Sequence, residues 1–454
     1  MRHRCFRLCF LLILLPTSPV SADDWPQWLG PGRDGVWAED GIVESLPDDG
    51  PPLIWKAEIG SGYSGPAVAQ GRVIVLDRIA APQTGEEEYL HEGDVPQNSN
   101  FVRRRLPGRE RVVCLNEADG SVLWTHEYDC PYSTATTYAI GPRATATIAD
   151  ELVYTVGAEG DLYCLRLSDG SVVWSKNYRE DYGVSVPVWG IASPPLVDDN
   201  RLICTVGGQD STCVAFDRKT GEQLWQSMSA REPGYSAPVI RNIGGHRQLL
   251  CWDSSNLSAL SPETGEVIWQ VPFESTFAMS VATPQVEGQR VFVMCFNGKS
   301  AMVEVAEDGQ SAKLVWSGRR TSGIDGVHNT PQIVNGHVYG CGNGGRYICA
   351  DLLTGRRLWF TFDAVSAARP IPWGNVFTVR NADQFFLSND KGELIIAKLT
   401  PQGFTEVSKA KLIEPTHNIG SRTLVWSHPA FANRRIYLRN DKEIRCYSLA
   451  AGKH

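Results

Sequence analysis

Four polar side chains in the second half of the chain are of types that could do chemistry. Asp325, His328 and Asn329 stand within five positions of one another, and His428 lies near the C-terminus. A neutral imidazole can act as a base or bind a metal. A hydrogen-bonded structural histidine is the simpler interpretation of either histidine alone. The elements that position these residues must therefore decide their role.

Familiar catalytic motifs are absent from the sequence. It contains no C-x-x-C, H-E-x-x-H, G-x-S-x-G or G-x-x-x-x-G-K-[ST] pattern. The glycine-rich stretch GCGNGG (340–345) falls between two expected strands, so it indicates a hairpin and not a nucleotide-binding loop. These absences argue against zinc enzymes, serine hydrolases and nucleotide-dependent enzymes, and we predict neither a catalytic residue nor a metal ligand.

One phrase recurs along the chain: a strand, a turn with glycine, and a strand that carries tryptophan. Two copies are VVCLNEADGSVLW (112–124) and LYCLRLSDGSVVW (162–174). The glycine suits a tight hairpin turn because it adopts a positive φ at little cost. Six positions before the glycine, seven of the eight copies carry Cys or Ala and the fifth carries Val303, which suggests close packing between sheets. The turn glycines are Gly120, Gly170, Gly221, Gly265, Gly309, Gly355, Gly403 and Gly452.

A second pair of short strands precedes each of these hairpins, and the first of the pair often contains proline. Four strands in a unit of 44 to 51 residues is typical of a propeller blade. The eighth unit ends before its tryptophan strand, whereas PPLIWKAEIG (51–60) near the N-terminus has a tryptophan strand without a preceding turn. We therefore predict an all-β fold: an eight-bladed β-propeller of four-stranded antiparallel blades, with the N-terminal strand closing the last blade.

The segments before the innermost strands of a propeller converge on a central funnel. Here they are rich in aromatic side chains with a few cations, amides and histidines, which resembles a site for a small molecule or peptide. Large aromatic side chains that merely fill the space between eight loops are the alternative. The predicted ligand-binding residues are Tyr63, Arg143, Trp189, Tyr235, Asp325, His328, Asn329, Arg369, Trp373, Arg422, Trp426 and His428.

Three segments fall outside the repeats. Residues 1–22 have a basic start, a short apolar run and small residues before position 23, which predicts a cleavable signal peptide cut near Ala22. Residues 23–50 predict an irregular arm laid on the propeller, for latching or for docking a partner. Residues 79–110 interrupt the first blade of the propeller at 51–454 as a loop insertion, which could be a lid, a docking loop or simply solvated.

Composition narrows the class of protein. The 454 residues carry a net charge of −8 and are 42% hydrophobic, so a large core is expected and nucleic-acid binding is not. No run beyond the first 22 residues is long enough to span a membrane. We expect an exported, periplasmic or secreted monomer.

Ten cysteines remain after the expected cleavage site. Most occupy the small-residue position of the repeat or lie within apolar strands, so buried free thiols are the favoured interpretation. Disulfides between Cys204 and Cys213 or between Cys341 and Cys349 stay open, because each pair could face one another across a hairpin.

The phrase A-x-D/S-x-x-T/D-G-x-x-x-W resembles the quinoprotein-like (PQQ-like) β-propeller superfamily over residues 51–452. The segment WPQWLGPGRDG (25–35) is similar to the start of exported planctomycete-type PQQ-binding-like proteins, and the chain more distantly resembles BamB. BamB-like members are scaffolds that bind envelope proteins, whereas quinoprotein dehydrogenases hold PQQ and Ca²⁺ in the funnel and oxidise alcohols or sugars.

The resemblance implies two functions, and the aromatic funnel adds a third. We expect a non-catalytic scaffold of the cell envelope that binds a protein or ligand and needs no cofactor. The first alternative is a PQQ- and Ca²⁺-dependent dehydrogenase, which needs a Glu/Asn pair on calcium and an Asp base; the funnel segments offer Asn329 and Asp325 but no clear Glu partner. The second alternative is a carbohydrate-binding propeller that uses the aromatic side chains of the funnel.

Overall fold

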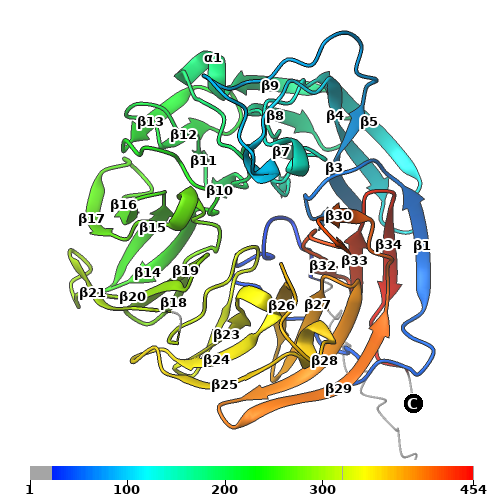
Figure 1. Ribbon diagram of the computed structural model, residues 1–454, viewed down its shortest axis with the longest axis vertical. Helices are drawn as coiled ribbons and strands as arrows, with labels where there is room; N and C mark the ends of the chain where they lie inside the picture. Colours follow the sequence, from blue (N-terminus) through cyan, green and yellow to red (C-terminus); the bar gives the residue numbers. More distant parts are fainter. Residues whose placement is uncertain (1–22, 320, 453–454) are drawn as a thin grey trace, which may run out of the picture.

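Each repeat forms a four-stranded antiparallel sheet, and eight such sheets stand around a central axis (Figure 1). The computed structural model describes residues 23–319 and 321–452, so the expected signal peptide at 1–22 lies outside the described residues. The sheets pack face to face, and the apolar residues between them form the core. The predicted eight-bladed propeller is confirmed.

The strands run outward from the axis in chain order within blades one to seven, and β1 forms the outermost strand of blade eight. Blades one to three comprise β2 (Ala67–Ala69), β3 (Arg72–Ala80), β4 (Gly108–Asn116), β5 (Val122–Asp129); β6 (Thr147–Ala149), β7 (Leu152–Val156), β8 (Asp161–Arg166), β9 (Val172–Asn177); β10 (Leu196–Asp198), β11 (Arg201–Thr205), β12 (Cys213–Asp217), β13 (Gln223–Ser227). Blades four and five comprise β14 (Val239–Ile243), β15 (His246–Trp252), β16 (Asn256–Leu260), β17 (Val267–Pro272); β18 (Gln285–Glu287), β19 (Arg290–Cys295), β20 (Lys299–Val305), β21 (Ala312–Ser317). Blades six to eight comprise β22 (Gln332–Val334), β23 (His337–Cys341), β24 (Tyr347–Asp351), β25 (Arg357–Thr361); β26 (Val376–Asn381), β27 (Gln384–Asn389), β28 (Glu393–Thr400), β29 (Gly403–Lys411); β32 (Ala430–Ala432), β33 (Arg435–Arg439), β34 (Glu443–Ser448), β1 (Leu53–Glu58).

Few other elements interrupt this pattern. A helix α1 (Tyr178–Tyr182) follows blade two, and a hairpin of β30 (His417–Ile419) and β31 (Arg422–Leu424) lies between blades seven and eight. Among the described residues, no helix is long and apolar enough to cross a membrane. The short 3-10 turns are η1 (Ser99–Phe101), η2 (Thr136–Tyr138), η3 (Thr276–Ala278), η4 (Asn343–Gly345) and η5 (Asp363–Val365).

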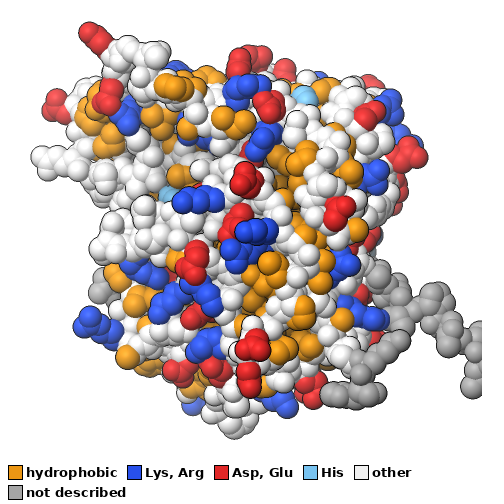
Figure 2. Space-filling model, turned by 90° about the vertical axis from the view of Figure 1, so that its right-hand side faces the viewer, with side chains coloured by type: hydrophobic (Ala, Val, Ile, Leu, Met, Phe, Trp, Pro, Cys, Tyr) orange, Lys and Arg blue, Asp and Glu red, His pale blue; other side chains and the backbone are white. Residues whose placement is uncertain are grey.

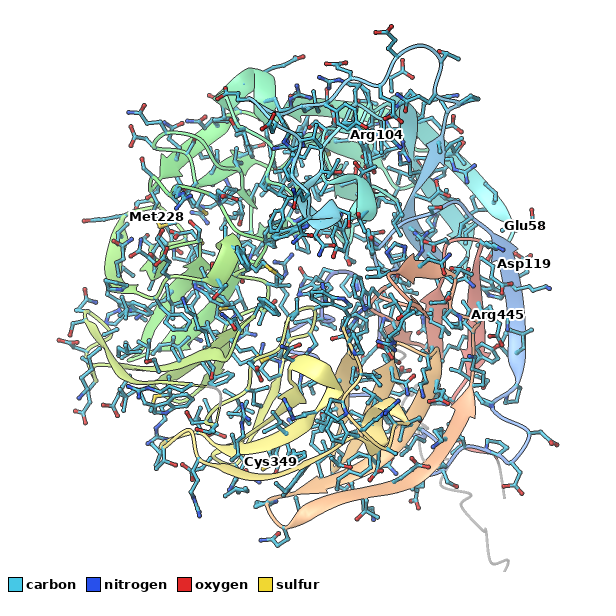
Figure 3. All side chains as sticks on the ribbon, in the orientation of Figure 1. Glu58, Arg104, Asp119, Met228, Cys349 and Arg445 are labelled. Carbon is cyan, nitrogen blue, oxygen red and sulfur yellow. The ribbon has the colours of Figure 1, made fainter. Side chains whose placement is uncertain are left out.

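The ends of the chain meet in the last blade. Strand β1 pairs antiparallel with β34, and Trp55 stands opposite Cys446. Figure 3 labels Glu58 of β1 and Arg445 of β34, which lie on this shared blade. The N-terminal strand therefore completes the eighth sheet, as the missing tryptophan strand of the last repeat predicts.

Tryptophan and glycine join neighbouring blades. The Trp124 ring of blade one lies on Gly170 in the turn of blade two, and a Cβ on that glycine would overlap the ring. The Trp124 indole also donates to the carbonyl of Leu167 at 2.9 Å. The same arrangement places Trp55 on Gly120. The repeat thus needs glycine for two reasons: glycine adopts the positive φ, and its lack of a side chain leaves room for the tryptophan ring of the preceding blade.

Blades four and five depart from this arrangement. The Trp269 indole donates to Oε1 of Gln248 at 2.7 Å, and Nε2 of Gln248 donates to the carbonyl of Gly309 at 2.8 Å, so the glutamine bridges the gap. The three extra residues in the fifth hairpin also shift its register. Met302, and not Val303, stands opposite Trp316.

The seam between blades seven and eight has no tryptophan, because Val407 occupies that place. Neither Gly403 nor Gly452 adopts the positive φ that the repeat predicts for them. The arm covers this seam instead: Trp37 packs between Phe386 of β27 and Phe431 of β32, with ring centroids 5.4 and 5.1 Å apart. Further along the arm, the N–H of Val43 donates a hydrogen bond to the carbonyl of Leu449 at 2.9 Å, and the N–H of Leu46 donates one to the hydroxyl of Ser408 at 2.8 Å.

The ten described cysteines are buried free thiols. The sequence favours free thiols, and neither of the two disulfides that it leaves open forms: Cys213 stands opposite Thr205, and Cys341 stands opposite Tyr347. Figure 3 labels Cys349, which lies inside the sheet of blade six opposite Trp359. The small side chain fits the position opposite the tryptophan of the repeat, so packing accounts for this cysteine.

The outer wall of the ring is of mixed character. The outermost strands expose aliphatic side chains such as Val122 on β5 and Leu53 on β1. Figure 2, which views the molecule from the β1 side, shows hydrophobic, acidic and basic side chains interspersed over this wall. The aliphatic residues are thus divided by charges on this side.

Candidate functional site

The innermost strands bring residues from all parts of the chain to one chamber on the axis. Its volume is about 340 Å³, within the range of about 300–1,000 Å³ that holds small ligands. Its lining is Trp28, Tyr63, Asn98, Asn100, Phe101, Tyr138, Arg143, Trp189, Ala192, Pro194, Tyr235, Ala237, Phe277, Met279, Val281, Phe296, His328, Trp373, Phe377, Trp426 and His428.

The arm forms the floor of the chamber. It crosses behind the central opening (Figure 1) and pairs with the innermost strands, for example Trp25 with Val68. The buried guanidinium of Arg33 donates to the carbonyl of Pro238 at 2.7 Å and to that of Pro195. Trp28 donates to the hydroxyl of Thr283 at 2.9 Å and turns its ring toward the chamber. The arm therefore closes one end of the channel.

The insertion of blade one covers part of the other end. It crosses the front of the ring toward the central opening (Figure 1), and η1 contacts η2. Arg103 donates to the carbonyls of Ser133 at 2.7 Å and Val186 at 3.2 Å, which fixes the insertion over blade two. Phe101 then lies beside Trp189, with ring centroids 5.8 Å apart. The insertion is thus an ordered part of the funnel wall.

Two aromatic residues of the mouth have unusual backbone conformations. Phe277 has a φ of 55° and Trp373 has a φ of 58°, in the left-handed region that bulky residues seldom adopt. Phe277 is 60% exposed and lies 5.9 Å from Phe101 between ring centroids. Phe296 stacks on Trp373 at 6.1 Å. Strained residues are concentrated at binding and catalytic sites in proteins, so the aromatic mouth is a candidate ligand entrance.

Arg143 is the single charged side chain among the described residues that line the chamber. Its guanidinium lies 4.3 Å from the centre of the Tyr63 ring and donates to the carbonyl of Tyr138 at 2.6 Å. Tyr63 in turn shares a hydrogen bond of 3.1 Å with Nε2 of His417. No described carboxylate forms an ion pair with Arg143. The chamber therefore has a positive end without a protein counter-ion.

The two histidines of the chamber are uncharged at neutral pH. Burial lowers the pKa of His428 to about 4, and burial together with Arg143 lowers that of His328 to about 3. Nδ1 of His428 lies 2.6 Å from the carbonyl of Pro429. His328 stacks on Trp426 with ring centroids 4.2 Å apart. Neutral imidazoles offer a ligand hydrogen bonds without charge.

The structure brings eight of the twelve sequence-predicted site residues into the chamber lining: Tyr63, Arg143, Trp189, Tyr235, His328, Trp373, Trp426 and His428. The other four lie outside that lining. The side-chain amide of Asn329 donates hydrogen bonds to the carbonyl of Cys341 and to Oδ1 of Asn375. Arg422 forms an ion pair with Asp390 at 2.9 Å, and Arg369 is exposed. Asp325 pairs with Arg357 at 3.5 Å in a separate cleft of blades five and six.

Sequence reasoning did not place the arm and the insertion in the chamber. Trp28, Asn98, Asn100 and Phe101 come from these non-repeating segments, whose position no periodicity gives. The signal that could have found Trp28 was the concentration of aromatic residues in the arm. Phe377 lies within the innermost strand β26, one register position beyond the converging segments.

The chamber does not fit a calcium ion with PQQ. Calcium needs about six to eight oxygen ligands, several from carboxylates, and no carboxylate occurs in the described lining. Asn329 donates from Nδ2, and its buried Oδ1 has no partner among the described residues, but Asn329 lies outside the described lining and Asp325 lies in the other cleft. In the described part of the chain, no three His, Cys, Asp or Glu side chains gather as a metal site.

Comparison with known proteins identifies relatives of the fold and sequence. The sequence model of a family described as outer membrane protein assembly factor BamB matches residues 108–361 and 275–401. BamB of Yersinia pestis is 28% identical over 220 residues, which are 46% of this chain and 51% of that protein. BamB of Alkalilimnicola ehrlichii is 25% identical over 199 residues, 44% of this chain and 47% of that protein. The chain thus spans about half the length of the curated relatives it matches.

Solved structures share the fold at low identity. BamB from Moraxella catarrhalis has a TM-score of 0.51 and 17% identity, covering 84% of this chain and 99% of that one. Quinohemoprotein alcohol dehydrogenase from Comamonas testosteroni has a TM-score of 0.60 and 14% identity, covering 95% and 81%. At such identities the likeness concerns the fold alone. Because the family's sequence model matches more than half of the residues, the chain belongs to the BamB family of PQQ-like β-propellers.

Proposed function

We propose that the protein is a non-catalytic binding protein of the cell envelope that holds its ligand in the central chamber. The observation that carries the proposal is the chamber itself, closed by the arm and rimmed by aromatic side chains. A lining whose described residues include one cation and no carboxylate favours binding over proton transfer or metal chemistry. The name of the relatives, outer membrane protein assembly factor, supports an envelope location for an exported chain.

A fluorescent probe tests whether the chamber binds. 8-Anilinonaphthalene-1-sulfonate is an aromatic anion, and we expect it to bind saturably at one site and to quench tryptophan emission. Trp189→Ala should weaken this binding at least tenfold, because Trp189 forms part of the chamber wall beside Phe101. Phe360→Ala is the matched control, since Phe360 is 56% exposed on the outermost strand β25. Equal loss in both variants, or no saturable binding, contradicts the proposal.

A second measurement distinguishes binding from oxidation. PQQ and Ca²⁺ are added to the purified protein, and the reduction of a redox dye is followed with alcohols and sugars. We expect no turnover, because the described lining lacks the carboxylates that calcium and a base would require. Dye reduction that depends on the substrate, on PQQ and on an intact Trp189 would establish a dehydrogenase and overturn the proposal.

A further inference from the structure

The two ends of the chamber have opposite hydrogen-bonding character. At one end, the Arg143 guanidinium offers donors without a protein counter-ion, and its Nε is buried without a partner among the described residues. His328 lies close enough for the charge of Arg143 to influence it. A guanidinium binds a carboxylate in a planar geometry with two hydrogen bonds. This end therefore suits a single carboxylate.

The other end offers an acceptor, which the tautomer of His428 fixes. A backbone carbonyl can only accept, so Nδ1 of His428, 2.6 Å from the carbonyl oxygen of Pro429, carries the hydrogen. Nε2 of the neutral ring then presents a lone pair. His428 is 5% exposed and lies between Trp28 at 4.8 Å and Phe377 at 5.0 Å, measured between ring centroids. A ligand that reaches this floor gains by donating a hydrogen bond to Nε2.

The walls between the two ends are flat and aromatic. Trp426 stacks on His328 at 4.2 Å and lies nearly parallel to Tyr138, with an interplanar angle of 11°. The volume of about 340 Å³ is at the lower limit of small-ligand sites, which suits a body of one or two rings. The ligand's body is therefore planar and apolar.

We propose that the chamber binds a hydroxylated aromatic carboxylate, with its carboxylate on Arg143 and its ring hydroxyl donating to Nε2 of His428. This inference rests on the proposed binding function and names the class of ligand. A compound with three carboxylates would leave two of them without a cation, since Arg143 is the only charged side chain in the described lining. A neutral sugar would leave Arg143 without a counter-ion.

Matched probes test each part of this inference on the unaltered protein by calorimetry. 4-Hydroxybenzoate and 4-hydroxycinnamate differ in the span between carboxylate and hydroxyl, and we expect at least one of them to bind. Benzoate or cinnamate lacks the hydroxyl, the corresponding 4-hydroxy amide lacks the charge, and each should bind about tenfold or more weakly. An amide that binds as well as its acid, or an unsubstituted acid that binds as well as its hydroxy form, overturns the inference.

Two substitutions assign the contacts to residues. Arg143→Met should weaken the hydroxy acid at least tenfold while leaving the hydroxy amide unchanged. His428→Leu should remove the advantage of the hydroxy acid over the unsubstituted acid without changing the affinity for the latter. An advantage that persists in His428→Leu overturns the assignment, and the probe comparison on the unaltered protein stands even if a variant does not fold.

The outcome is separable from failure of the binding function. If the anilinonaphthalene probe binds through Trp189 and none of the hydroxy acids does, the ligand class is wrong and the binding function stands. If a sugar such as glucose binds in the chamber more tightly than the hydroxy acids, the ligand class is likewise wrong. If neither probe type binds, both proposals fail.

Discussion

At the residue scale, a buried glutamate in blade one stands out from the rest of the core. Glu110 is fully buried and accepts hydrogen bonds from the Tyr128 hydroxyl at 2.7 Å, from the Tyr132 hydroxyl and from the N–H of Ala158 at 3.1 Å. Burial nevertheless raises its pKa from 4.5 to about 7, and the nearby Asp161 adds to the rise. The folded protein therefore retains the carboxyl proton of Glu110 at pH values where the unfolded chain has released it.

This proton makes stability depend on pH. The stabilisation that Glu110 adds to the free energy of unfolding is fully present below pH 4.5 and is lost as the pH rises to about 7. Over that interval the folded state holds a proton on Glu110 that the unfolded chain has released, so a rising pH favours unfolding. Glu110→Gln cannot ionise, so urea unfolding from pH 4 to 8 should show the advantage of the native protein over the variant shrinking by up to about 3 kcal/mol.

The comparison of the two proteins isolates Glu110 from groups that act in the opposite direction. Burial lowers the pKa of His428 to about 4, which destabilises the folded state as the pH falls below 6.5 in both proteins. Glu86→Gln, on the exposed insertion, serves as the control and should leave the pH profile unchanged. Parallel profiles for the native protein and Glu110→Gln would refute the assignment.

At the scale of elements, the contact between the tryptophan of one blade and the turn glycine of the next explains how much of the fold the sequence could predict. The repeat predicts the strands and the turn glycines, because positive φ and hairpin length are local properties. The contact between Trp124 and Gly170 lies between two repeats, so local reasoning explains the glycine only in part. The alignment failed at Val303, because three extra residues moved Met302 into the position opposite Trp316.

Two glycines with the same backbone conformation separate the requirement for a positive φ from the requirement for space beneath the tryptophan ring. Gly170 has a φ of 73° beneath the Trp124 ring, whereas Gly71 has a φ of 74° and no atom within 4 Å of the place a Cβ would take. Alanine at either position incurs backbone strain of about 1–2 kcal/mol. Gly170→Ala should cost about 1–3 kcal/mol more than Gly71→Ala in chemical denaturation, because its methyl group displaces the tryptophan. Equal losses would show that the ring contact contributes nothing.

At the scale of the whole molecule, segments outside the repeat complete both the ring and the site. The sequence predicts the convergence of residues such as Trp189 and His428, because every blade brings the segment before its innermost strand toward the axis. It did not predict that Trp28 forms the floor or that Phe101 forms part of the wall. Asp325 was misplaced because the connection between blades five and six carries it into a neighbouring cleft, where it meets Arg357.

The arm's role at the seam is testable by hydrogen exchange. Trp37 is 1% exposed, and Trp37→Ala removes packing worth about 3–5 kcal/mol in typical cores. Because it contacts β27 and β32, the amides of blades seven and eight should exchange faster while those of blades two and three do not change. Trp359→Ala removes the hydrogen bond of 2.8 Å from the Trp359 indole to the carbonyl of Thr400, so it should instead speed amide exchange in blades six and seven. Uniform acceleration around the ring in both variants would contradict a local role for the arm.

The pairing of β1 with β34 has a consequence for biosynthesis. The first strand of the propeller leaves the ribosome early, yet its partner is made only after seven blades have been synthesised. Until then the nascent protein is an incomplete circle with open edges, which are prone to pair with other chains. Contacts between residues so distant in sequence form slowly, so closure of the last blade is the expected rate-limiting step of maturation.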